Sequence, residues 1–151
     1  MQKKLLILED NLYTAEILSE EITYTLSSHN IYNVEILVTN SIEEANEKIE
    51  QIDPKKLKCI IIDLNMNPIG LSIAEQRETH GATLTGWIWA YKYIIKKSGF
   101  KKTNIVFYSA FIDKLIKNSQ YQELSLKEKN RITLVDKNGM GNLNKKVLKL
   151  L

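Results

Sequence analysis

The chain has 151 residues, of which 44% are hydrophobic and 26% are charged, with only two prolines and six glycines. This composition is typical of one globular domain and excludes a disordered tail. The formal net charge of +3 comes from lysines scattered along the chain, so we expect no nucleic-acid-binding surface. No apolar run is long enough for a signal sequence or a membrane span, and we expect a cytoplasmic protein without membrane contact.

Apolar runs and helical patterns alternate along the first half of the chain. Leu5 to Leu8 is a continuous apolar run, which predicts a short strand buried on both faces. Apolar residues recur every three or four positions between residues 12 and 26, which predicts an amphipathic helix. Alternating apolar residues at 34–38 predict a second strand. Ser41-Ile42-Glu43-Glu44 resembles a capping box, and the helical spacing after it ends at Asp53-Pro54.

The second half of the chain continues the alternation. We predict strands at 58–62, 104–108 and 132–135. We predict helices at 85–98, at 112–124 with a weaker pattern, and at 143–150. Because buried strands joined by helices cross over with one hand, the pattern predicts an α/β fold with a parallel sheet and helices on both faces. Such sheets bind their ligands at the carboxyl ends of the strands.

Four of the five predicted strands end at residues with useful chemistry. Glu9 and Asp10 follow the first strand, Asp63 the third, Ser109 the fourth and Lys137 the fifth. Each alone is equally well explained as a polar residue that begins a turn. Together they bring three carboxylates to one edge, where protonation or a cation must relieve their repulsion. Because the available ligands are all oxygens, a hard divalent cation suits this edge better than zinc.

These residues, in this order, resemble the motif of the response-regulator receiver domain of two-component signalling. The resemblance covers nearly the whole chain as one domain, 1–151, and implies a doubly wound, flavodoxin-like sheet of five parallel strands in the order 2-1-3-4-5. It implies that Asp63 is the phosphorylated nucleophile and that Lys137 and Ser109 assist it. The implied ligands of Mg²⁺ (or Mn²⁺) are Glu9, Asp10, Asp63 and the backbone carbonyl of Asn65.

The chemistry of these residue types agrees with the resemblance. A carboxylate that attacks a phosphoryl donor forms an acyl phosphate, and the negative charge on the phosphoryl oxygens must be offset. Magnesium and Lys137 would offset it, and the Ser109 hydroxyl would donate a hydrogen bond to a third oxygen. We therefore expect a stand-alone phosphoacceptor domain that is not otherwise an enzyme, because it catalyses only its own phosphorylation and dephosphorylation.

The resemblance also implies partners. The donor would be a sensor histidine kinase or a phosphotransfer protein, and the output would be contact with a downstream protein that the sequence does not identify. The chain would be a monomer or a dimer that forms on phosphorylation.

Two substitutions depart from the family pattern beside the fifth strand. Leu134 stands three positions before Lys137, where the family has an aromatic residue that couples phosphorylation to a partner surface. Asn138 stands after Lys137, where most members have a proline that fixes the direction of the lysine. With leucine at 134, we expect any signal to travel mainly through backbone shifts after Ser109, and without proline at 138 the direction of Lys137 is less firmly fixed.

An insertion at about 67–85 is the third departure. Asn67 and about 15 further residues separate Asp63 and its loop from Gly86, which matches a glycine near the start of the family's third helix. Connections this long are usually functional or disordered. We hypothesise that Ile69 to Leu84 forms a flap that limits access to Asp63. An unchanged lifetime of the phosphoryl group after deletion of this segment would contradict the hypothesis.

Two other functions remain open. A pseudo-receiver would keep the fold as an interaction module without phosphorylation, and Leu134, Asn138 and the insertion favour it. A phosphatase of the haloacid-dehalogenase type also uses an aspartate nucleophile. That chemistry normally places the nucleophile after the first strand with a second aspartate two residues later, whereas Asp63 follows the third strand and is followed by Asn65.

Overall fold

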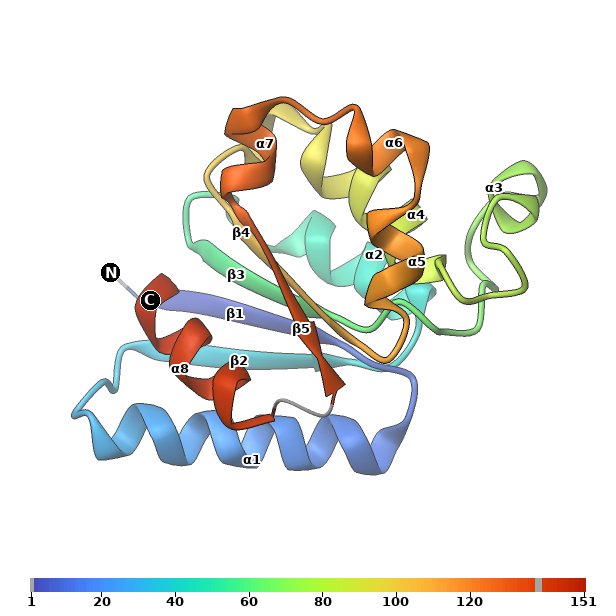
Figure 1. Ribbon diagram of the computed structural model, residues 1–151. Helices are drawn as coiled ribbons and strands as arrows, with labels where there is room; N and C mark the ends of the chain where they lie inside the picture. Colours follow the sequence, from blue (N-terminus) through green and yellow to red (C-terminus); the bar gives the residue numbers. More distant parts are fainter. Residues whose placement is uncertain (1, 138–139) are drawn as a thin grey trace.

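The computed structural model describes residues 2–137 and 140–151 as a five-stranded sheet with helices on both faces (Figure 1). The strands are β1 (Lys3–Leu8), β2 (Val34–Thr39), β3 (Leu57–Ile62), β4 (Asn104–Ser109) and β5 (Ile132–Asp136). All neighbouring strands are parallel, and their order is β2-β1-β3-β4-β5. The predicted fold class and strand order are confirmed, and the fold is of the flavodoxin-like α/β type. No helix in the described ranges combines the length and apolarity that crossing a membrane requires.

Helices α1 (Leu12–Ser28) and α8 (Met140–Leu150) cover one face of the sheet (Figure 1). The side chain of Asn11 begins α1 by accepting a hydrogen bond from the Thr14 N–H. The apolar stripe predicted from the sequence is the buried face of this helix. Its buried residues are Ala15, Leu18, Ile22 and Leu26. Cys59 lies in the same core, where burial raises the pKa of its thiol to about 12. It therefore remains an inert thiol at neutral pH.

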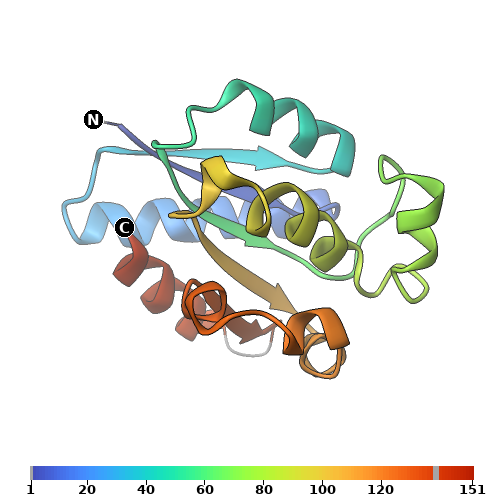
Figure 2. The same ribbon diagram turned by 90° about the horizontal axis from the view of Figure 1, so that it is seen from above.

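Helices α2 (Ile42–Gln51) and α4 (Thr85–Ala90) cover the other face (Figure 2). Trp89 in α4 donates a hydrogen bond from Nε1 to Asn46 Oδ1 of α2, 2.8 Å away. Trp87, also in α4, packs against β4, with its ring centroid 5.9 Å from that of Phe107. Every residue of α4 is buried, because neighbours surround this helix on all sides.

The helix predicted at 85–98 changes its winding after α4. Residues Tyr91–Ile95 form a π-helical turn, in which the Lys96 N–H donates to the carbonyl of Tyr91, and Ser98–Phe100 form a 3₁₀ turn. A single π-helical turn inside a helix often marks a functional site. The predicted span is therefore helical from Thr85 to Ile95, only its first part is α-helix, and the helix is interrupted at 96–97.

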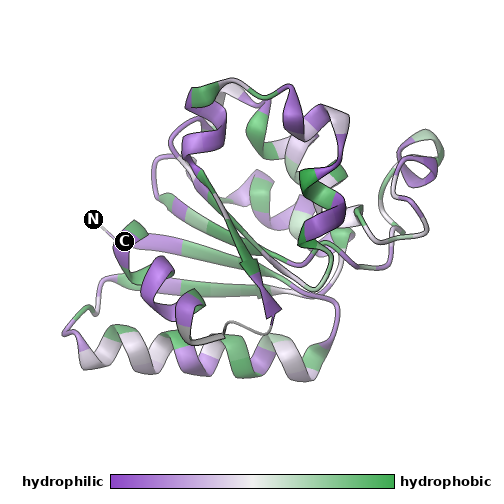
Figure 3. Ribbon diagram, in the orientation of Figure 1, coloured by the Kyte–Doolittle hydropathy of each residue, from purple (hydrophilic) through white to green (hydrophobic). Residues whose placement is uncertain are grey.

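The single helix predicted at 112–124 is wrong, because this stretch is broken into short helices. The structure has α5 (Ile112–Ile116), α6 (Ser119–Gln122) and α7 (Leu126–Asn130). The side chain of Asn118 accepts a hydrogen bond from the Tyr121 N–H, and Ser125 accepts one from the Glu128 N–H. Each cap starts a new helix and interrupts the apolar pattern that suggested a continuous one. Figure 3 shows that these short helices carry both polar and apolar residues.

Candidate functional site

The carboxyl ends of β1, β3 and β5 bring Glu9, Asp63 and Lys137 together. Lys137 Nζ lies 2.7 Å from Asp63 Oδ2 and 3.2 Å from Glu9 Oε1. The backbone holds both acids in place, because the Asp63 N–H donates to the Leu8 carbonyl and the Glu9 N–H to the Thr39 carbonyl. Lysine and glutamate that are 128 positions apart in sequence thus share one charged cluster.

The acids of this cluster are buried and the lysine is partly exposed. The relative exposure is 2% for Glu9 and 7% for Asp63, and 32% for the Lys137 side chain. Burial, and then the negative charge of Asp63, raise the pKa of Glu9 from its ordinary 4.5 to about 7, although Lys137 opposes the rise. Burial alone would lower the pKa of Lys137, but its contacts with both acids raise it. Lys137 is therefore a permanent cation here, whereas Glu9 exchanges a proton near neutral pH.

We expect the free energy of unfolding to fall by roughly 2–3 kcal/mol between pH 5 and pH 8 because Glu9 loses its proton. The measurement is made in the presence of a metal chelator. Between pH 4.5 and about pH 7 the folded protein holds a proton on Glu9 that the unfolded chain has released. The stabilisation from this proton is therefore lost as the pH rises through that window. Urea unfolding of the wild type and of Glu9→Gln at both pH values measures it. Equal pH dependence in the two proteins would contradict the assignment.

Asp10 and Asn65 lie beside the cluster without joining it. Asp10 is exposed, and its Oδ2 accepts a hydrogen bond of 3.0 Å from the Asn67 N–H. The Asn65 N–H donates to Asp63 Oδ1 at 3.2 Å. Asp10 therefore anchors the start of the insertion, and Asn65 orients the carboxylate of Asp63.

The described residues, 2–137 and 140–151, include no group of three or more His, Cys, Asp or Glu side chains that could hold a metal ion. Instead, the ammonium of Lys137 bridges Glu9 and Asp63. The donors themselves suit a hard divalent cation, because they are carboxylate oxygens and the buried Glu9 Oε2 has no hydrogen-bond partner within the described part of the chain. The predicted set of Glu9, Asp10 and Asp63 is nevertheless not assembled among the residues that the structure describes.

Ser109 lies at the end of β4, on the strand beside Asp63. It is fully buried, and its Oγ accepts a hydrogen bond of 3.1 Å from the Phe111 N–H. The hydroxyl thus fixes the turn that leads into α5. Leu134, in the middle of β5, is half-buried against the core under α4 to α6. Asn138, the second departure beside β5, lies outside the described residues.

Two further residues shape the site: Tyr108, which was missed in the sequence, and Gly86, which was matched by position without a role being assigned to it. The Tyr108 hydroxyl donates to the Lys137 carbonyl at 3.3 Å, so it fixes the backbone from which the lysine extends. The Gly86 N–H donates to the Leu64 carbonyl at 3.0 Å, and a Cβ on Gly86 would lie 2.1 Å from the carbonyl oxygen of Asp63. Only glycine lets α4 approach the Asp63 loop this closely. The Tyr108 hydroxyl acts through a backbone contact between residues that are distant in sequence, and glycine has no side chain that marks a site.

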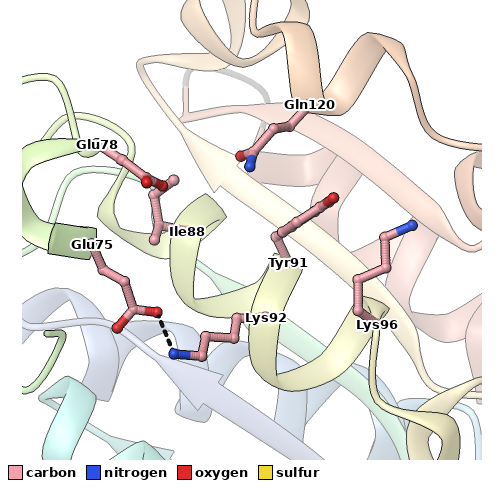
Figure 4. A pocket seen from close by; sticks show the side chains of 7 residues that line it. All are labelled: Glu75, Glu78, Ile88, Tyr91, Lys92, Lys96 and Gln120. Carbon is pink, nitrogen blue, oxygen red and sulfur yellow. Dashed lines mark ion pairs between the residues drawn. The ribbon is translucent and has the colours of Figure 1, made fainter.

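The insertion leaves the same edge of the sheet and extends beyond α4 and α5 (Figure 1). It contains a short helix, α3 (Ile73–Arg77), which begins with a capping box between Ser72 and Glu75. Glu75 forms an ion pair of 3.0 Å with Lys92 of the π-helical turn (Figure 4). Both residues line a pocket whose wall also includes Glu78 and Gln120. The insertion is therefore folded and attached to the domain. Its action as a flap stays a prediction.

No protein-family model matches this chain, and no curated protein matches it. The fold and the geometry at the strand ends therefore carry the functional argument.

Proposed function

We propose that this protein is a receiver-type phosphoacceptor domain in which Asp63 accepts a phosphoryl group with the help of a divalent cation. The observation that carries the proposal is the contact of Lys137 with Asp63, 2.7 Å between Nζ and Oδ2, at the carboxyl edge of a parallel sheet. This edge is where flavodoxin-like folds bind their ligands. The lysine there can offset the charge of a phosphoryl group, and the two acids supply a nucleophile and oxygen ligands for a cation.

In the proposed reaction, a carboxylate oxygen of Asp63 forms a bond to phosphorus while the bond from phosphorus to the leaving oxygen of the donor breaks. The leaving group departs with the electron pair of that bond, and the product is an acyl phosphate. Lys137 offsets the charge that accumulates on the phosphoryl oxygens, and the Asn65 N–H holds the carboxylate in position. A magnesium ion on Glu9, Asp10 and Asp63 would supply further positive charge.

The signal would leave the site through Ser109. Its hydroxyl holds the Phe111 N–H at the entrance to α5, and rotation toward a phosphoryl oxygen would release that contact. This contact holds the turn that leads into α5, so its release would move the short helices that follow. The proposed output surface is therefore α5 to α7. A histidine kinase or phosphotransfer protein as donor, and a downstream protein as target, belong to the same proposal.

A pseudo-receiver is the second candidate, and one observation favours it. Lys137 already bridges Glu9 and Asp63, so its ammonium offsets carboxylate charge without any ligand. Such a cluster could serve stability alone. The phosphatase alternative has weaker support, because the residue two positions after Asp63 is Asn65 and not an acid.

Intact-mass spectrometry after incubation with acetyl phosphate and Mg²⁺ tests the proposal. We expect one added phosphoryl group on the wild type and on the control Asp113→Asn, whose aspartate is exposed on α5, and none on Asp63→Asn. The absence of an adduct from all three proteins would favour the pseudo-receiver. Steady release of inorganic phosphate from phosphorylated metabolites, over many turnovers, would favour the phosphatase.

A further inference from the structure

A second pocket lies at the opposite edge of the sheet, where β3 and β4 begin. It has a volume of about 500 Å³ and is enclosed by the segment that enters β3 and the turn that enters β4. The β3 strand, six residues long, separates this pocket from Asp63 by roughly 20 Å. The pocket therefore shares no residue with the site described above.

Four lysines surround this pocket, and none has an acidic partner. Lys55 and Lys58 come from the β3 side, and Lys101 and Lys102 from the β4 side. Within residues 2–137 and 140–151, no carboxylate oxygen lies within 4.0 Å of any of their ammonium groups. Asp53, the acid closest to them in sequence, uses a carboxylate oxygen to accept the Lys55 N–H at 3.0 Å. The Lys58 ammonium donates to the Lys55 carbonyl at 2.8 Å, and the four positive charges around one cavity attract a multivalent anion.

The interior of the pocket is apolar. Pro54 and Leu57 contribute to its lining, and Gly99 opens it, because the glycine leaves the space beside the Pro54 ring free. A Cβ on Gly99 would lie 3.5 Å from Pro54 Cγ, an ordinary contact, so a longer side chain would extend into the cavity without a backbone clash. A volume of this size is in the range of small-molecule sites. The ligand should therefore combine an apolar, ring-like part with several negative charges.

We propose that this pocket binds a nucleotide, with its base against Pro54 and its phosphates among the four lysines. Lysine ammonium groups recognise phosphate as compact point charges, and the apolar lining accepts the face of a base. An inorganic anion would use only the charge, and an uncharged nucleoside only the apolar surface. The proposal does not depend on phosphorylation of Asp63, because the pocket and the strand-end cluster share no residues.

Isothermal titration calorimetry with ADP, at low salt and with a chelator, tests the proposal. We expect a dissociation constant on the order of 0.1 mM. The variant Lys55→Gln/Lys102→Gln should bind at least tenfold more weakly. Both lysines are exposed, so the fold should tolerate the change. Gly99→Met, which fills the cavity at unchanged charge, should weaken binding to a similar degree.

Two controls locate the binding. Lys145→Gln/Lys149→Gln removes the same charge from exposed positions on α8, on the other face of the sheet, and should change the dissociation constant less than twofold. Asp63→Asn should bind ADP as the wild type does. The proposal is overturned if the wild type does not bind ADP or if either control loses binding. It is also overturned if pyrophosphate binds as tightly as ADP while Gly99→Met has no effect.

Discussion

Replacement of Gly86 by alanine is expected to lower the free energy of unfolding by about 3 kcal/mol. The added Cβ would lie 2.1 Å from the Asp63 carbonyl oxygen and 2.7 Å from Ile62 Cγ2, so β3 and α4 must separate. A backbone atom cannot yield as a flexible side chain can, which makes this contact costly. The variant should also incorporate less phosphoryl group, because the loop that carries Asp63 is displaced. Urea denaturation measures the first effect and intact-mass spectrometry the second.

Gly99→Ala is the matched control, since its Cβ would be 3.5 Å from Pro54 Cγ. Its effect should stay below about 1 kcal/mol, which is the ordinary range of the glycine-to-alanine difference. Helix propensity alone would make Gly86→Ala stabilising by about 1 kcal/mol, because alanine is the better helix former. A stabilised Gly86→Ala protein would therefore contradict the close packing of α4 on the Asp63 loop.

Replacement of Lys137 by methionine is expected to destabilise the protein by roughly 2 kcal/mol at pH 8 in a chelator. The change leaves Glu9 and Asp63 buried without their cation, and the usual cost of such a loss is reduced here because 32% of the lysine side chain is exposed. At pH 6 the loss should be smaller. Without Lys137, which lowers the pKa of Glu9, this acid is more fully protonated and repels Asp63 less.

Magnesium gives this variant a second readout. If Glu9 and Asp63 can hold a divalent cation, millimolar Mg²⁺ should raise the midpoint of thermal unfolding of Lys137→Met more than that of the wild type, because no ammonium competes for the carboxylates. Lys145→Met, on the exposed face of α8, is the control and should respond as the wild type does. A Lys137→Met protein as stable as the wild type at both pH values would show that the ion pairs contribute nothing.

Much of the fold follows from local sequence patterns. The apolar runs at Leu5 to Leu8 and before Asp63 have the continuous character of strands buried on both faces, and they are β1 and β3. The spacing from residue 12 onward marks α1 because its buried face is regular. The grouping of Glu9, Asp63 and Lys137 was also predictable, because parallel strands place their carboxyl ends at one edge.

The parts that were missed depend on capping and on contacts between distant residues. The helices α3 and α7 begin with Ser72-Ile73-Ala74-Glu75 and Ser125-Leu126-Lys127-Glu128, two capping-box motifs that were readable in the sequence. The hydrogen bond from Tyr108 to the Lys137 carbonyl has no local signal, because it joins residues that are 29 positions apart. The bridging position of Lys137 between two acids, in place of a three-carboxylate group, likewise arises only from the packed side chains.

Reduction with borohydride tests most directly whether Asp63 is the phosphoacceptor. An acyl phosphate on an aspartate is reduced to homoserine, whereas a free carboxylate is unchanged, so peptide mapping identifies the modified position. After treatment with acetyl phosphate and Mg²⁺, we predict homoserine at position 63 and at no other aspartate, with none formed when the donor is omitted. An unchanged Asp63, or homoserine at another position such as Asp10, would contradict the proposed role of the strand-end cluster.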